Sequence, residues 1–313
     1  VFSSNLFANK IGVIYDSGGK FDKSFNELAF RTAERVKNEL GWEMIEFEAA
    51  NNTQIEQGMR KVADRGANLV VAMGFAQADA VAAVAPQYPD VKFVAVDVCW
   101  VDDPAGNIYQ ACYKEHEGSF LVGMIAAMAS KSGKIGFVGG MDIPLIRKFQ
   151  GGYEQGAQYV NPDIEVLANM TGTTNEAWNN PTKGAELTKA QIDGGADVVY
   201  QAAGGTGIGV LQAAADAGIM GIGVDANQNW MHPGNMLTSM LKRLDLTIFA
   251  QAEAIAAGTF EPSGQFLSLG LAEGGVGYAT EDGMVTDEMA AAADAAAADI
   301  ASGAIVVADW SQE

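Results

Sequence analysis

The chain has 313 residues, 49% of them hydrophobic, which is enough to bury the cores of two domains of ordinary size. Its 39 acidic residues outnumber 19 basic ones, and the formal net charge of −20 repels phosphate backbones and anionic lipids. We therefore expect neither nucleic-acid binding nor a membrane-surface role. No apolar run reaches the roughly 18 residues of a membrane-spanning helix.

Short β-rich runs alternate with amphipathic segments in the first part of the chain. We expect strands at 10–16, 43–49, 68–74, 92–98 and 107–113, and helices at about 24–40, 54–65 and 77–85. Ser24 and Glu27 form a capping box, which predicts that the first helix begins at Ser24. Apolar strands joined by helices predict a parallel sheet covered on both faces.

The same order of motifs recurs in the second part. "GKIGFVGG" (133–140) repeats "NKIGVIYD" (9–16), and "GADVVYQAAGG" (195–205) repeats "GANLVVAMG" (66–74). Phe149 takes the place of Phe25, and Asp225 takes the place of Asp97. This repetition predicts two lobes of one architecture, each an open α/β sheet.

The end of the chain does not make a third copy. It offers one helix after "MLTSMLKRLD", a strand-like run at 265–271 and an alanine-rich helix at about 286–302. We expect these single elements to complete the two lobes, so the chain crosses between the lobes more than once. The predicted N-terminal lobe is 1–114 plus about 243–270, the C-terminal lobe is 115–242 plus about 271–313, and the hinge lies near 113–117, 240–243 and 269–273.

Ligands of open α/β sheets bind outside the carboxyl ends of the strands. Two facing lobes then place those ends around one cleft. The residues that follow the predicted strands and so become candidates are Asp16 to Asn26, Gly74 to Gln77, Asp97 to Trp100, Trp178, Gly204 to Gly207, and Asp225 to Asn229.

Two aromatic residues are candidates for stacking on a flat ligand. Phe25 follows the cap of the first helix, but ordinary core packing explains it equally well, since Phe149 stands at the matching place. Trp178 lies in the polar loop "NEAWNNPTKG", where a tryptophan is a poor core residue. One ring from each lobe can sandwich a planar ligand and gain both burial and stacking.

The acids favour a neutral ligand rich in hydrogen-bond donors. Asp16, Asp97 and Asp225 each lie at or near the end of a strand-like run, where a carboxylate accepts bonds from hydroxyl and ring N–H groups. Turn capping is the alternative for either Asp97 or Asp225 alone. The loop "AAGGTGIG" (202–209) lacks both phosphate-loop spacings, and Lys242 is read either as a ligand contact or as a solvated surface lysine.

Catalytic and metal motifs are not visible. His116 and His232 are the two histidines, neither lies in a nucleophile motif, and no zinc spacing occurs. Cys99 and Cys112 are compatible with a disulfide in an exported protein and, equally, with two buried thiols. The start "VFSSNLFANK" shows no signal peptide, although a cleaved leader leaves no trace.

With these residues in view, the chain resembles the basic membrane protein family of ABC-transporter substrate-binding proteins, which includes purine nucleoside receptors. The resemblance covers about 10–280 and rests on "DSGGKFDKSFN" (16–26), "EHEGSFLVG" (115–123), "GGMDIPLIRKFQGGYEQGA" (139–157), "AAGGTGIGV" (202–210), "GVDANQ" (223–228) and "TSMLKR" (238–243). It implies the type I periplasmic-binding-protein clamshell, with three crossovers between two Rossmann-like lobes.

The resemblance also implies roles for individual residues. Asp16 and Asn26 would contact the ligand, Phe25 would stack from the first lobe, and Trp178 stands where relatives usually carry Phe. The sugar hydroxyls would be bound by Asp225, Lys242 and the backbone near Gly205, with Phe75, Gln77 and Asp97 as further contacts. Trp178 and "DVCWVDD" (97–103) depart from the family pattern, and a free base or riboflavin remains an alternative ligand.

We therefore predict an exported solute-binding protein of the periplasm or cell envelope that hands a purine nucleoside to an ABC-transporter permease. We expect a monomer without catalysis, cofactor, metal or nucleic-acid partner. A DNA-binding regulator with this sensor fold conflicts with the acidic charge. A nucleoside hydrolase requires an aspartate cluster for its metal, and the two acids of "DSGGKFD" are not adjacent.

Overall fold

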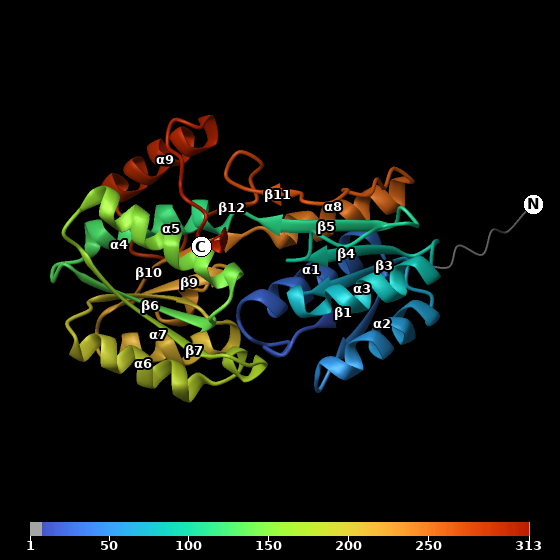
Figure 1. Ribbon diagram of the computed structural model, residues 1–313, viewed down its shortest axis with the longest axis horizontal. Coiled ribbons are helices and arrows are strands. Elements are labelled where there is room, and N and C mark those ends of the chain that lie inside the picture. The colour runs from blue at the N-terminus through green and yellow to red at the C-terminus, as the bar shows by residue number, and fades with distance from the viewer. Residues whose placement is uncertain (1–7, 313) are drawn as a thin grey trace, which may run out of the picture. The chain divides into compact units, whose positions relative to one another are not determined.

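The computed structural model describes residues 8–312, so the chain start in which we saw no signal peptide lies outside the described residues. The chain forms two compact units (Figure 1). Unit 1 holds residues up to Lys20 with Asn26–Cys112 and Leu244–Ser268. Unit 2 holds Phe21–Phe25, Tyr113–Arg243 and the residues from Leu269 onward.

Unit 1 is built on a six-stranded sheet with the order β11-β5-β4-β3-β1-β2. Four neighbouring pairs in this sheet are parallel, namely β2 with β1, β1 with β3, β3 with β4, and β4 with β5. Their bounds are β1 Lys10–Tyr15, β2 Glu43–Glu48, β3 Leu69–Met73, β4 Lys92–Val96, β5 Ile108–Tyr113 and β11 Ser268–Leu269. The helices are α1 Phe25–Leu40, α2 Ile55–Asp64, α3 Ala78–Val84 and α8 Leu244–Ala257.

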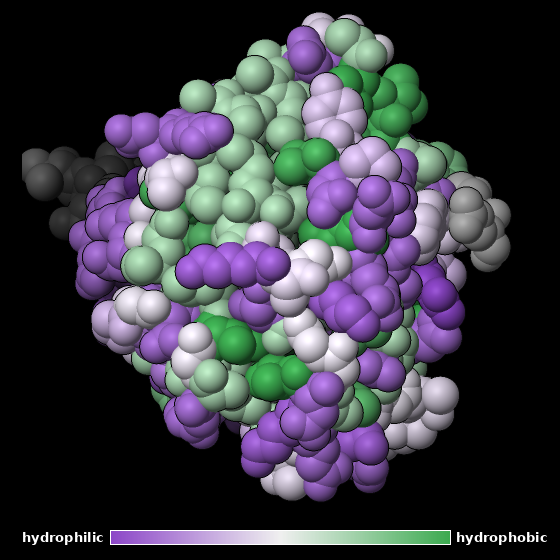
Figure 2. Space-filling model, turned by 90° about the vertical axis from the view of Figure 1, so that its left-hand side faces the viewer, coloured by the Kyte–Doolittle hydropathy of each residue, from purple (hydrophilic) through white to green (hydrophobic). Residues whose placement is uncertain are grey.

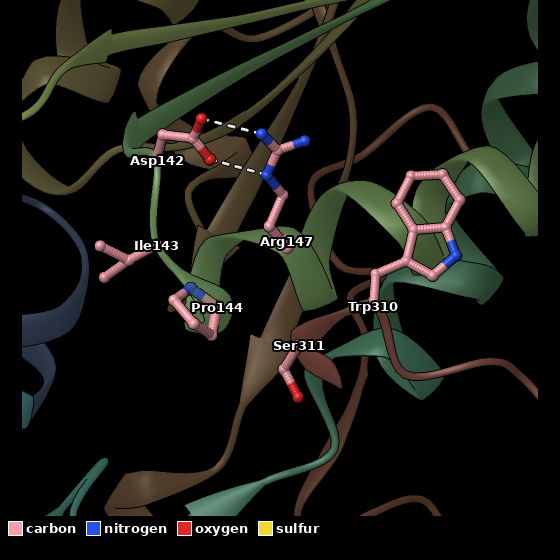
Figure 3. Close-up of a pocket in the computed structure, with 6 residues that line it drawn as sticks. All are labelled: Asp142, Ile143, Pro144, Arg147, Trp310 and Ser311. Carbon is pink, nitrogen blue, oxygen red and sulfur yellow. Dashed lines mark hydrogen bonds and ion pairs between the residues drawn. The ribbon is translucent and has the colours of Figure 1, made fainter. Parts of the chain in front are cut away.

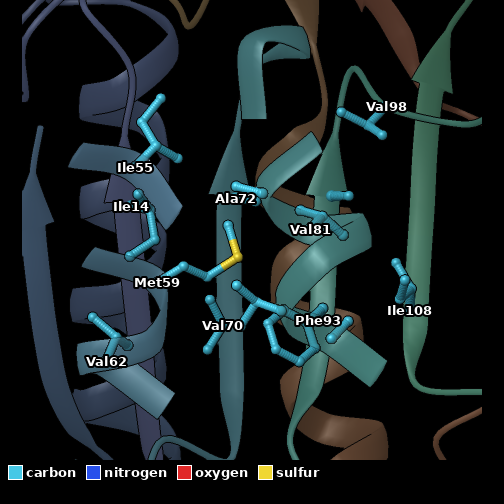
Figure 4. Packing of buried hydrophobic residues seen from close by; sticks show 14 of the residues in the cluster. Ile14, Ile55, Met59, Val62, Val70, Ala72, Val81, Phe93, Val98 and Ile108 are labelled. Atoms are coloured by element: carbon cyan, nitrogen blue, oxygen red, sulfur yellow. The ribbon is translucent and has the colours of Figure 1, made fainter. Parts of the chain in front are cut away.

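The core of unit 1 lies between the sheet and helices α2 and α3. Figure 4 shows Met59 of α2 and Val81 of α3 packed over Val70 and Phe93 of the sheet, and all four side chains are inaccessible to solvent. Helix α8 packs against β3 and β4. The continuous apolar runs of these strands therefore belong to a sheet covered by helices.

Unit 2 repeats this topology with the strand order β12-β10-β9-β8-β6-β7. Its strands are β6 Lys134–Met141, β7 Glu165–Gly172, β8 Val198–Ala202, β9 Met220–Asp225, β10 Met236–Lys242 and β12 Val276–Tyr278. Strand β12 is antiparallel to β10. The other neighbouring pairs are parallel, namely β7 with β6, β6 with β8, β8 with β9, and β9 with β10. The helices are α4 Glu115–Ala129, α5 Pro144–Val160, α6 Pro181–Asp193, α7 Gly207–Asp216 and α9 Asp287–Ser302.

Helices α4 and α5 cover one face of this sheet and α6 and α7 the other (Figure 1). Helix α9 packs on α4, where Ala296 and Ile300 meet Phe120 and Met124. Its remaining surface is rich in alanine, and in Figure 2 pale green dominates the upper half, at the height of α9 in Figure 1. None of the helices within residues 8–312 is long and apolar enough to cross a membrane.

The predicted pattern of elements is confirmed in most places. Helix α1 begins at Phe25, directly after the predicted cap Ser24, and α9 ends at Ser302 as expected. The strand expected at 265–271 is reduced to Ser268–Leu269. The chain passes from one unit to the other after Lys20, Phe25, Cys112, Arg243 and Ser268.

Cys99 and Cys112 form a disulfide in unit 1. The loop after β4 folds back over the end of β5, where Val98 forms an antiparallel bridge with Ala111, and Asp97 donates its N–H to the same residue. The disulfide thus decides between the two alternatives left open by the sequence. It fixes the loop that carries Asp97 to the strand that leads into unit 2.

We predict that replacing both cysteines by serine lowers the free energy of unfolding by about 2–4 kcal/mol, because the crosslink restricts a loop of about 15 residues in the unfolded chain. Urea unfolding of oxidised wild type and of Cys99→Ser/Cys112→Ser measures this difference. Wild type treated with a reductant serves as the matched control and is expected to unfold like the variant. Equal stability of the oxidised and reduced proteins would contradict the prediction.

Candidate functional site

In unit 1 the predicted residues Asp16 and Asn26 are joined in one hydrogen-bonded pair. Asn26 Nδ2 donates to Asp16 Oδ1 at 2.6 Å, and the Asp16 backbone N–H donates to Asn26 Oδ1 at 3.1 Å. Asn26 is fully buried, and Asp16 Oδ1 also accepts the N–H of Gly18 at 2.8 Å. The glycine loop therefore closes around its own carboxylate, whose negative charge disfavours a phosphate at this place.

The strand order places a switch point between β1 and β3, the usual position of ligands in such sheets. Phe75 and Gln77 follow β3 there, after the turn at Gly74, whose φ of 94° suits glycine. Gln77 is inaccessible to solvent and donates to the carbonyl of Ile14 at 2.9 Å. Gln77 thus braces the end of β1, whereas Phe75 is half-buried.

Asp97 and Asp225 share an unusual backbone. They stand at matching places, at or just beyond the ends of β4 and β9, with φ of 61° and 67°, and each is 7% exposed. Left-handed backbone is uncommon outside glycine, and such outliers gather at functional sites. The match between the units extends to this detail.

In unit 2 Trp178 lies over the corresponding switch point, between β6 and β8. Its ring packs on Gly140 of β6, where an added Cβ would come within 2.1 Å of the ring atom Cζ3. Thr206 ties its loop to the turn containing Gly205, because its hydroxyl donates to the Ala177 carbonyl at 2.7 Å. Trp178 and the Gly205 turn are therefore neighbours, as a shared site requires.

Asp225 lies beside Ser24. The Ser24 hydroxyl is 2.8 Å from the Val224 carbonyl oxygen and 3.2 Å from Asp225 Oδ2, and Gln228 Nε2 donates to the Lys23 carbonyl at 3.0 Å. The segment Phe21–Phe25 is thereby held at the carboxyl end of β9. The sequence predicted Ser24 as a helix cap and missed this second role.

Lys242, at the end of β10, is buried with 1% exposure, so it is no solvated surface lysine. Its ammonium nitrogen lies 5.3 Å from the ring centre of Phe25, 5.2 Å from that of Tyr113 and 5.7 Å from that of Phe149. These distances are within the range of cation–π attraction. Phe25 and Lys242 thus lie together in unit 2, and Asp225 stands on the neighbouring strand, where it pairs in register with Leu241.

A buried carboxylate neutralises part of this charge. Glu115 is inaccessible to solvent and lies 2.9 Å from the Lys242 nitrogen and 2.7 Å from that of Lys148. Burial alone raises the pKa of a carboxyl, but the ammonium groups of Lys148 and Lys242 outweigh it and hold the pKa of Glu115 below its usual value. Glu115 and Lys148 lie in motifs quoted for the family resemblance, but the sequence assigned them no role.

A separate pocket of about 470 Å³ opens in unit 2 at the start of α5. Asp142 and Arg147 form a two-pronged ion pair on one side, and Trp310 lies on another (Figure 3). The remaining lining residues are Ile143, Pro144 and Ser311. None of the ten predicted site residues lines it, and its guanidinium is already paired, so it does not alter the assignment.

Comparison with known proteins decides the family. A family model described as "ABC transporter substrate-binding protein PnrA-like" matches residues 8–310. The chain belongs to this family. Among its relatives, Basic membrane protein A2 of Borrelia garinii subsp. bavariensis is 34% identical over 286 residues, covering 90% of this chain and 82% of that protein. An uncharacterised lipoprotein of Pyrococcus furiosus is 34% identical over 289 residues, covering 88% of this chain and 71% of that protein.

Solved structures of other solute-binding proteins share the fold of this chain. One from an ABC transporter system of Aeropyrum pernix K1 has a TM-score of 0.85 and 27% identity, covering 96% of this chain and 93% of its own. One from Conexibacter woesei has a TM-score of 0.77 and 28% identity, covering 97% and 99%. The lac repressor has a TM-score of 0.59 and 14% identity, covering 90% of this chain and 83% of its own, and this likeness shows the fold alone. The predicted fold class and the non-enzymatic solute-binding role are confirmed.

We predict that this solute-binding protein loses stability as the pH falls below about 6.5, in part through His116. Burial lowers the pKa of His116, and Lys148 lowers it further against the opposing acids Asp309, Glu117 and Glu115. The unfolded chain therefore takes up a proton at a higher pH than the folded one. Stability from the neutral imidazole is complete above the unfolded pKa and declines below it.

Urea unfolding of wild type and His116→Gln at pH 7.5 and 5.5 tests this expectation. The stability loss between the two pH values is expected to be smaller in His116→Gln. His232→Gln is the matched control, since burial also lowers the pKa of His232, though His232 is the less buried histidine. An identical pH dependence in wild type and His116→Gln would contradict the assignment to His116.

Proposed function

We propose that this solute-binding protein captures a purine nucleoside and delivers it to a membrane permease. The observation that carries the proposal is the grouping of Phe25, Asp225 and Lys242 in unit 2. The carboxylate and the ammonium supply an acceptor and a donor beside an aromatic ring. A nucleoside has the complementary parts, namely hydroxyl groups on its sugar and a planar base.

Each predicted residue has a role in this proposal. Phe25 and Trp178 stack on the base, while Asp16 and Asn26 hold its edge. Asp225, Lys242 and the backbone at Gly205 bind the sugar hydroxyls. Phe75 and Asp97 are further contacts, and Gln77, whose amide is used on β1, contributes mainly by holding that strand end.

The ligand is enclosed as the two units close, which requires a hinge where the chain passes from one unit to the other. The partners are the nucleoside and an ABC-transporter permease, and the protein acts as a monomer in the cell envelope. The names of its relatives, basic membrane proteins and lipoproteins, support that location. A free purine base or riboflavin is the alternative ligand, favoured by the large ring of Trp178.

Native mass spectrometry of the purified protein tests the ligand class. The panel contains adenosine, inosine, guanosine, hypoxanthine, riboflavin and, as a control, uridine. We expect at least one purine nucleoside to bind more tightly than hypoxanthine, riboflavin and uridine. Preferential binding of riboflavin or of the free base would replace the nucleoside by the alternative ligand.

We predict that Phe25→Ala and Trp178→Ala each weaken nucleoside binding by about 1–3 kcal/mol, because each ring stacks on the base. This is a loss of about fivefold to 150-fold in affinity by titration calorimetry. Tyr159→Ala, which removes a ring that is 59% exposed on α5, is the control and should bind like wild type. Unchanged affinity in folded Phe25→Ala and Trp178→Ala would refute the stacking clamp and, with it, the purine assignment.

We predict a selective effect for Asp225→Asn. Asparagine tolerates the left-handed backbone at this position, so the substitution removes the charge with little strain. Affinity for the ribonucleoside should fall, whereas any affinity for the free base should change much less. An equal loss for both ligands would argue against a sugar contact.

A further inference from the structure

We propose that Glu115 is a positioning residue that fixes the Lys242 ammonium for ligand binding, and that Lys148 fixes Glu115 in turn. The proposal rests on the role of Lys242 in the proposed function. It assigns a purpose to two residues that the predicted site did not include.

Each oxygen of the Glu115 carboxylate pairs with a different ammonium group. Glu115 Oε1 is 2.9 Å from Lys242 Nζ, and Glu115 Oε2 is 2.7 Å from Lys148 Nζ. Lys148 Nζ also donates to the carbonyl of Tyr113. The carboxylate is thus held on both sides and has little freedom to turn away from Lys242.

Lys242 depends on such a partner because of its surroundings. Its side chain has four flexible carbons, and Phe25, Tyr113 and Phe149 surround the ammonium with ring centres at 5.2–5.7 Å. Rings attract a cation but accept hydrogen bonds poorly, and a buried charge without an ionic or hydrogen-bonding partner is costly. Glu115 supplies a fixed anion, and an ammonium has three N–H donors, so the pair does not exhaust its bonding capacity.

The backbone is shaped to bring Lys148 to Glu115. Helices α4 and α5 approach so closely that a Cβ at Gly152 would lie 2.2 Å from the His116 carbonyl oxygen, and one at Gly156 would lie 1.9 Å from that of Phe120. Only glycine fits this contact. The glycines of "FQGGYEQGA" (149–157) and the acid of "EHEGSFLVG" (115–123) therefore serve one arrangement.

The charged groups of this cluster are buried. The carboxylate of Glu115 and the ammonium groups of Lys148 and Lys242 lie where side-chain exposure is between 0% and 11%. Such a cluster favours a ligand oxygen that accepts a hydrogen bond, as a sugar hydroxyl does. Without the Glu115 charge, the two ammonium groups would face each other and the position of Lys242 would be lost.

Titration calorimetry on a double-mutant cycle tests the proposal. The proteins are wild type, Glu115→Gln, Lys242→Met and the double variant, each titrated with the preferred ribonucleoside and with its free base. Glu115→Gln is expected to lower the ribonucleoside affinity about tenfold, within the range of coupling between contacting residues. The free-base affinity should change much less, and Glu115→Gln should have no further effect once Lys242 is methionine.

Two other variants keep the test decisive. Lys148→Met releases Glu115 from its other side and is expected to reproduce the selective loss, which matters if Glu115→Gln does not fold. Glu165→Gln breaks the solvent-exposed pair with Lys134 at 3.0 Å and should bind like wild type. A Glu115→Gln effect that is equal for both ligands, or that persists in the Lys242→Met background, would show a merely structural role and overturn the proposal.

The outcome also separates this inference from the proposed function. If wild type prefers another compound of the panel, the nucleoside assignment fails, but the coupling between Glu115 and Lys242 is still expected with that compound. If a ligand binds and Lys242→Met leaves its affinity unchanged, the inference fails while the solute-binding role stands. If no panel compound binds, both assignments fall.

Discussion

The candidate site in unit 2 contains one buried carboxylate shared by two ammonium groups. Glu115, at the first position of α4, meets Lys148 from α5 and Lys242 from β10. Two helices and a strand are thereby fixed to one another by charge as well as by apolar packing. Because removing one partner of a buried pair leaves a charge uncompensated, this arrangement constrains all three elements at once.

The aspartates of the candidate site stand where they do because the strands of each sheet are parallel. Strands that run in the same direction end at the same edge, so Asp16, Asp97 and Asp225 stand at the carboxyl ends of their sheets. The left-handed backbone at Asp97 and Asp225 shows that the repeat preserves more than strand order. The same left-handed backbone therefore occurs at the end of the corresponding strand in both units.

Much of this was predictable because it depends on local patterns. Apolar runs predicted the strands, the capping box predicted the start of α1, and the repeat predicted two sheets of one topology. The burial of Lys242 and its ion pair with Glu115 were not predictable, because they arise from packing between segments distant in sequence. The pairing of Cys99 with Cys112 was likewise undecided, since it depends on how the loop after β4 folds back on β5.

The loop between β1 and α1 shows how local and distant constraints combine in one segment. Its flanks, Asp16 and Asn26, bond to each other in unit 1, while Phe21–Phe25 packs in unit 2. Ser24 precedes the first residue of α1, as its sequence pattern requires, and its hydroxyl also reaches Val224 and Asp225. Ser24 thus starts the helix and also contacts Asp225, a candidate ligand-binding residue. It therefore couples the position of the Phe25 ring to that of Asp225. The two side chains assigned to the base and to the sugar are therefore set by the same short turn.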